Sequence, residues 1–260
     1  MNFLRLGLLI MASLAVSPLL LRAQDGIEEP KGSLGRRGYP PRKPLEVSAV
    51  KVWVQKGKQR LMNVPYFRAK GVAVEKGNIV CTDHDGVRRQ LTDSGRDSAP
   101  VLSPDGRLIA FVRGTPDKIV ATGSGDVEAT ELWIVGSHDG KPVMVVHGRE
   151  SKDMQQVIGG ILGAQFSPDG HRVYFLSAAW ATSGAVHVID LATHKERFFT
   201  DGSGLEIVPN GDYQGCLLIQ KHRYFIGGGT YDWFWLIKPD GKEVGPVGED
   251  TENFRSTFVK

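Results

Sequence analysis

Two stretches of the sequence decide the fold: SPDGRLIAFV at 103–112 and SPDGHRVYFL at 167–176. In each, Ser-Pro-Asp-Gly stands directly before a run of apolar and aromatic residues that is typical of a β-strand. Proline presets the backbone of a tight turn, aspartate can accept hydrogen bonds from nearby backbone amides, and glycine tolerates positive φ. The unit therefore predicts a β-hairpin, and Pro209-Asn210-Gly211-Asp212 is a weaker third copy.

A second kind of hairpin follows each copy, and one more precedes the first. These hairpins lie at 78–92, 131–146, 186–200 and 233–247. Two successive hairpins make a four-stranded antiparallel blade, and blades bury both faces only by stacking side by side around an axis. We therefore predict an all-β fold, a β-propeller of about four four-stranded blades, either closed or open and incomplete. The first unit shows clearly only its second hairpin. Residues 45–62 also fit a hairpin that would supply its missing strands.

These residues carry a family resemblance. The stretch RQLTDSGRDSAPVLSPDGRLIAFV at 89–112 resembles the WD40-like repeat of TolB-like β-propeller proteins, and GAQFSPDGHRVYFLS at 163–177 with HVIDLATHKERFFTDG at 187–202 resembles a second complete unit. The match covers roughly residues 77–247. The same repeat occurs in the propellers of prolyl-oligopeptidase-like peptidases and of some polysaccharide lyases.

This chain is shorter than all of these proteins and has no visible counterpart of TolB's amino-terminal α/β domain. The resemblance therefore does not imply TolB's own role in an envelope complex. A truncated relative of a larger propeller is one further interpretation.

The first residues fit a secretory signal peptide. Arg5 gives a positive start, residues 6–21 are almost uninterruptedly apolar, and small Ala23 precedes polar sequence. The apolar run is short for a membrane span, and Pro18 interrupts it, although a retained membrane anchor is the alternative. We expect a periplasmic or secreted protein organised as a signal peptide at 1–23, a basic flexible linker at 24–44 and the propeller at 45–260.

Charge is distributed unevenly along the chain. Residues 31–70 carry eleven Lys or Arg and one acid, Glu46, whereas residues 71–260 are net acidic. The basic segment is either a contact region for an anionic envelope component or acidic protein patch, or a linker that its charge keeps solvated. We expect no nucleic-acid partner, and no later segment is apolar enough to span a membrane.

Cysteine and histidine patterns indicate no cofactor. The two cysteines, Cys81 and Cys216, lie in apolar strand-like runs. This placement favours two buried thiols that act as small apolar residues, and a disulfide between them is the alternative. His84-Asp85-Gly86 and His138-Asp139-Gly140 fall in equivalent turns, where turn chemistry explains Asp-Gly, so we expect no metal site there. No Gly-x-Ser-x-Gly nucleophile motif is present.

The topology predicts where binding residues gather. Hairpin turns of one kind share one rim of a propeller, and the long connections lie on the opposite rim, where binding usually resides. The exposed candidates on these connections are Arg149, Lys152, Asp153, Trp180 and Tyr231, and ordinary solvated loop side chains are the alternative reading of each. We predict a binding module without catalytic activity that engages a protein or an envelope polymer. The alternative is an enzyme or enzyme remnant, either lyase-like or the orphaned propeller of a peptidase. The long connections lie at 114–130, 148–160, 178–184 and 227–232.

Overall fold

The computed structural model describes residues 69–138 and 140–259. All of them belong to one structural unit of the chain, Leu45–Lys260. The predicted signal peptide at 1–23, the linker at 24–44 and the hairpin at 45–62 lie outside the described residues, as does nearly all of the basic segment.

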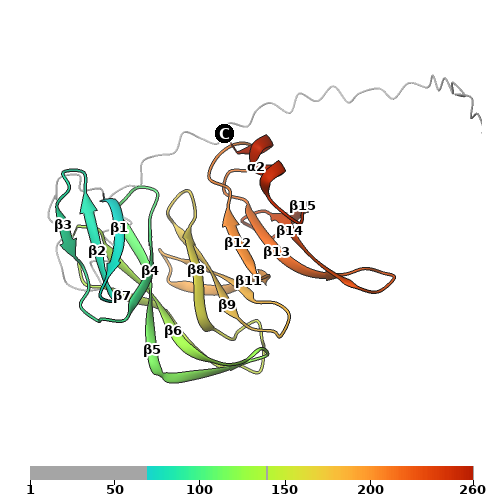
Figure 1. The fold of residues 1–260 in the computed structure, drawn as a ribbon, viewed down its shortest axis with the longest axis horizontal. Coiled ribbons are helices and arrows are strands. Elements are labelled where there is room, and N and C mark those ends of the chain that lie inside the picture. The colour runs from blue at the N-terminus through green and yellow to red at the C-terminus, as the bar shows by residue number, and fades with distance from the viewer. Residues whose placement is uncertain (1–68, 139, 260) are drawn as a thin grey trace, which may run out of the picture. The chain divides into compact units, whose positions relative to one another are not determined.

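The described residues form fifteen strands in four antiparallel sheets, which succeed one another in chain order (Figure 1). We number the sheets 1 to 4 in chain order. Sheets 2, 3 and 4 each have the four strands that the repeat predicts, whereas sheet 1 has three strands among the described residues. Sheet 1 contains β1 (Ala69–Glu75), β2 (Asn78–Asp83) and β3 (Arg88–Gln90); sheet 2 contains β4 (Asp97–Leu102), β5 (Leu108–Thr122), β6 (Gly125–Gly136) and β7 (Val143–His147). Sheet 3 contains β8 (Gly159–Phe166), β9 (Arg172–Ala178), β10 (Ala185–Asp190) and β11 (Lys195–Asp201); sheet 4 contains β12 (Gly204–Ile207), β13 (Leu217–Tyr224), β14 (Thr230–Ile237) and β15 (Glu243–Gly248).

The Ser-Pro-Asp-Gly turns join the first two strands of sheets 2 and 3, as predicted. The Ser103 hydroxyl donates to Asp105 Oδ1 at 2.6 Å and accepts the Leu108 amide at 2.9 Å. Gly106 has a φ of +73°, and its counterpart Gly170 has a φ of +72°. Side-chain capping and a left-handed glycine thus close each turn, which is why four residues suffice to reverse the chain.

The four second hairpins are also confirmed, as the antiparallel pairs β2–β3, β6–β7, β10–β11 and β14–β15. Two elements differ from expectation. Residues 114–130, expected as a loop, instead continue β5 and β6 as a paired ladder that ends at Thr122 and Gly125, beyond a register shift after Gly114. The short helix α2 (Glu252–Phe258) was not anticipated either.

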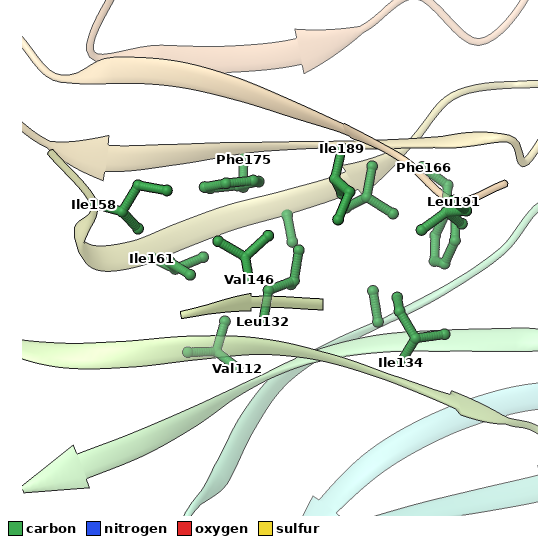
Figure 2. Packing of buried hydrophobic residues seen from close by; sticks show 13 residues of the cluster. Val112, Leu132, Ile134, Val146, Ile158, Ile161, Phe166, Phe175, Ile189 and Leu191 are labelled. Atoms are coloured by element: carbon green, nitrogen blue, oxygen red, sulfur yellow. The ribbon is translucent and has the colours of Figure 1, made fainter. Parts of the chain in front are cut away.

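The core lies between successive sheets rather than inside any one of them. Ile109 and Phe111 of β5 pack toward sheet 1, while Ala110 and Val112 pack toward sheet 3. Figure 2 shows the second of these interfaces, where Leu132 and other aliphatic side chains of sheet 2 face the buried side chains of sheet 3. Strand alternation therefore gives each middle sheet two buried faces, which is the packing of propeller blades.

Helix α2 covers the face of sheet 4 that points away from sheet 3. Phe254 packs with Leu218 and Leu236 in a cluster that also includes Cys216. The Arg255 guanidinium pairs with Glu206 of β12, with Nε 3.0 Å from Oε1. The last sheet thus buries its outward face against a helix.

The two cysteines are buried free thiols in different clusters. Burial raises the pKa of both Cys81 and Cys216. The thiol interpretation is therefore the correct one, and the disulfide alternative is wrong.

Candidate functional site

Strand direction places the long connections at the same ends of the four sheets, and we call this end the connection rim: residues 114–130, 148–158, 179–184 and 225–229. Three of them touch. The Gly123 amide donates to the Ala179 carbonyl at 2.6 Å, and the Ala121 amide donates to Glu150 Oε1 at 3.2 Å. Val157 packs beneath this contact with Val120 and Ala129. The β5–β6 hairpin therefore lies across the neighbouring connections and holds them in place.

The tight turns lie together on the opposite rim, which we call the turn rim. Gly170 of one Ser-Pro-Asp-Gly turn lies beside Pro104 of the preceding turn, and Gly215 lies beside Pro168. The separation of tight turns from long connections, predicted from strand direction, thus matches the neighbours seen on each rim.

Arg149 is the best anchored of the predicted site residues. Its Nη2 atom lies 2.6 Å from Glu196 Oε2, and its Nε donates to the Gln156 carbonyl at 2.8 Å. Its backbone pairs with Ile158. The side chain is 29% exposed, so the guanidinium reaches the surface while Glu196 and the Gln156 carbonyl hold it in place.

Behind Arg149 lies a buried pair that the sequence analysis missed. The Nδ1 atom of fully buried His187 lies 2.6 Å from Glu196 Oε1, and the imidazole stacks on Phe175 with a centroid distance of 5.4 Å. Burial raises the pKa of Glu196, but the hydrogen bonds from His187 and Arg149 outweigh it and lower the pKa overall. His187 sits in the apolar run VHVID, where nothing in the sequence signals a polar partner.

Trp180 joins the same region from another connection. It is half-buried and meets Phe198 edge to face at a centroid distance of 6.1 Å, and Phe198 in turn meets His187 edge to face at 5.9 Å. Strand β11, which carries Glu196 and Phe198, therefore supports both Arg149 and Trp180. The structure thus brings these two predicted residues to one part of the connection rim.

Lys152 and Asp153 lie in the same connection as Arg149, and both are exposed. The Asp153 carboxylate accepts the Gln155 amide at 3.0 Å, and the Asp153 amide donates to Ser151 Oγ at 3.1 Å. A tight local turn therefore presents the Lys152 and Asp153 side chains to solvent.

Tyr231 lies apart, on the β13–β14 hairpin. Its ring contacts Phe225 at 4.6 Å and Trp233 at 5.0 Å between centroids. Further along β14, Trp235 packs toward sheet 3 and Phe234 packs toward α2. Aromatic side chains of β14 therefore pack on both faces of sheet 4.

A second buried charge cluster joins sheets 3 and 4. The Lys221 ammonium is 3.0 Å from Asp201, 2.9 Å from Glu243 and 2.6 Å from the Thr200 hydroxyl, and its side chain is almost wholly buried. Burial raises the pKa of Asp201, but Lys221 outweighs it and lowers the pKa overall. Every donor of the ammonium is used by the protein itself, so the cluster is a structural tie between blades.

Within residues 69–138 and 140–259, no three His, Cys, Asp or Glu side chains are grouped to hold a metal ion. His138 of one Asp-Gly turn lies with its Nδ1 2.7 Å from Arg89 Nη1.

No helix in this part of the chain is long and apolar enough to cross a membrane.

No protein-family model and no curated protein matches the chain. Several solved structures do match it. A putative TolB from Agrobacterium tumefaciens is 14% identical, with a TM-score of 0.44 and coverage of 69% of this chain and 58% of that one. The β-propeller domain of the Trilobed protease from Pyrococcus furiosus, described as having an open velcro topology, is 15% identical, with a TM-score of 0.46 and coverage of 71% and 56%.

The acylaminoacyl peptidase of Pyrococcus horikoshii is 14% identical, with a TM-score of 0.45 and coverage of 70% of this chain and 32% of that chain. The chain thus spans less than two thirds of the length of each of these proteins. Its TolB-like propeller fold is established by the repeat at 89–112 and 163–202 and by the four sheets themselves.

Proposed function

We propose that this chain is an exported binding module without catalytic activity, and that it engages a protein or an envelope polymer through the connection rim. One observation carries the proposal. Arg149 and Trp180 are both partly exposed, yet each is fixed by a residue of β11, Glu196 or Phe198. Tryptophan and arginine dominate the energetics of interfaces, and anchors that are already ordered lose little side-chain entropy when a partner binds.

The surroundings of these anchors support the same reading. Lys152 and Asp153 stand exposed in the connection that carries Arg149, so exposed side chains of both charges lie in the same connection as this anchor. By contrast, the turn rim is built from tight turns whose side chains cap their own backbone, as Ser103 and Asp105 do. Export is supported by the signal-peptide pattern at 1–23.

Arg149 also has a structural role, and this decides how the proposal is tested. Removing its guanidinium leaves the Glu196 carboxylate, which is only 10% exposed, without one of its two partners. Breaking a buried ion pair costs about 3 kcal/mol. An Arg149 variant would therefore lose stability as well as any contact with a partner, so the test relies on Trp180 and Lys152 instead.

The test is capture of a partner from the periplasmic or extracellular fraction by the native protein, followed by the same capture with variants. The double variant Trp180→Ala/Lys152→Glu is expected to weaken capture at least tenfold. Lys242→Glu, an exposed lysine of the turn rim, serves as the matched control and is expected to capture normally. Equal capture by the double variant and the native protein would contradict the proposal.

A further inference from the structure

The tip of the β13–β14 hairpin carries the longest run of exposed large apolar side chains among the described residues. Tyr224 is 69% exposed, Phe225 is 52% exposed, and Ile226 is fully exposed. The hairpin projects away from the other sheets, toward the right of Figure 1. An exposed apolar patch of this kind marks an interaction site in a folded protein.

The tip continues the β13–β14 ladder outward and does not fold back onto the sheet. Strands β13 and β14 pair without a register shift from Leu217 to Tyr224. The Phe225 amide donates to the Gly229 carbonyl at 3.1 Å, and the Gly228 amide donates to the Phe225 carbonyl at 3.0 Å. The Phe225 ring leans on Tyr231 behind it. These contacts leave Ile226 at the apex with nowhere to bury its side chain.

Polarity changes in layers along the hairpin. Residues 224–231, YFIGGGTY, contain no charged side chain. The tyrosines stand at the two ends of this segment, below the apex. Charged side chains begin only behind the tyrosines. Arg223 pairs with Glu243 at 2.7 Å, and the Asp232 carboxylate lies 2.8 Å from His222 Nδ1.

This order of layers is the order of a membrane interface. Aliphatic and phenyl groups partition into the acyl region, tyrosine is enriched at the headgroup level, and ion pairs stay in water. We propose that the tip at 224–231 inserts into the interfacial region of a lipid bilayer and attaches the propeller to a membrane surface without spanning it. Because residues 224–231 carry no charged side chain and the nearest cation, Arg223, is paired with Glu243, attachment depends on apolar burial and not on anionic lipid. The contact involves neither Arg149 nor Trp180, so it stands or falls separately from partner binding.

The test is flotation of the purified exported protein with phosphatidylcholine vesicles, with and without added phosphatidylglycerol. Burying an isoleucine side chain is worth a factor of ten or more in partition, so Ile226→Asp is expected to lower vesicle binding at least about tenfold. Ile119→Asp is the matched control, because Ile119 is a 53% exposed isoleucine on the β5–β6 hairpin of the same rim. It is expected to bind like the native protein.

A second variant reports insertion directly. With Ile226→Trp, vesicles of brominated phosphatidylcholine should quench the additional fluorescence. The proposal is overturned if the native protein does not float, if Ile226→Asp floats equally well, or if binding needs anionic lipid and disappears at high salt. It is also overturned if Ile226→Asp abolishes capture of a soluble protein while vesicles remain unbound, because the tip would then fit a protein pocket.

Discussion

The carboxylate of Glu196 and the imidazole of His187 form a hydrogen-bonded pair, Nδ1 to Oε1 at 2.6 Å, beneath the connection rim. His187 is fully buried on β10, and Glu196 lies on the neighbouring strand β11. The other carboxylate oxygen receives Arg149 from the connection between sheets 2 and 3. One carboxylate therefore ties two blades together and fixes a candidate binding residue at the surface.

Glu196 should make stability depend on pH in the acid range. Burial alone raises its pKa, but the hydrogen bonds from His187 and Arg149 lower it below the ordinary glutamate pKa in the folded protein. A depressed folded-state pKa gives stability that is present above the unfolded pKa and is lost as pH falls through the folded one. We expect Glu196→Gln to cost about 2 kcal/mol at pH 7 and progressively less below pH 4.5. Urea unfolding between pH 7 and pH 3 measures this.

The control for that series is Glu249→Gln, which changes an exposed carboxylate. The free energy of unfolding of this variant should equal that of the native protein at every pH. A Glu196→Gln penalty that stays constant down to pH 3 would mean that the carboxylate is not stabilised in its charged form.

The Ser-Pro-Asp-Gly turns should tolerate only glycine at their last position. Gly106 and Gly170 have φ values of +73° and +72°, which β-branched residues strongly disfavour. We expect Gly106→Val and Gly170→Val each to cost about 1–3 kcal/mol and to lower the melting temperature. Gly71→Val is the control, because Gly71 has no positive φ and no neighbour near its side-chain position. Native-like melting of both turn variants would show that the turns do not adopt this backbone.

Helix α2 should be an integral cover of sheet 4. Phe254 is buried between the sheet, Tyr213 and Phe258. We expect Phe254→Ala to cost about 3 kcal/mol, since it empties a buried aromatic site. Hydrogen exchange should then speed up first in β13 and β14. The exposed neighbour substitution Glu252→Ala should leave both stability and exchange nearly unchanged, and the same result for Phe254→Ala would mean that the helix does not pack there.

The two cysteines should behave as unreactive thiols. Burial raises the pKa of Cys81 and of Cys216, which lowers the thiolate fraction and blocks access. A thiol reagent should label neither residue rapidly in the native protein and both in urea without reductant. Finding no thiols in the unfolded protein would reveal a disulfide instead.

Local signals predicted much of this fold. The Pro-Asp-Gly and Asp-Gly turns depend on residues within a few positions, so their hairpins could be identified from the sequence. The ladder extension to Thr122 and Gly125 could not, because its polar turn Thr-Gly-Ser-Gly resembles a loop. Strand β1 was missed because only Ala69 of its seven residues is buried, so the stretch lacks the apolar run that marks the other strands.

The candidate site was predictable only in outline. Topology placed Arg149 and Trp180 on one rim, but the residues that hold them are remote in sequence. Glu196 lies 47 positions after Arg149, and its partner His187 is hidden in an apolar strand. The Arg149–Glu196 contact arises from the stacking of sheets 2 and 3, about which a single hairpin sequence carries no information.

The most direct measurement of the central claim is hydrogen exchange of the native protein alone and with the partner it captures. The account predicts slower exchange in the partner complex at residues 148–158 and 179–184, with the turns at 103–106 and 167–170 unchanged. Protection confined to the turns, or spread without preference over both rims, would contradict the claim that the connection rim is the binding surface.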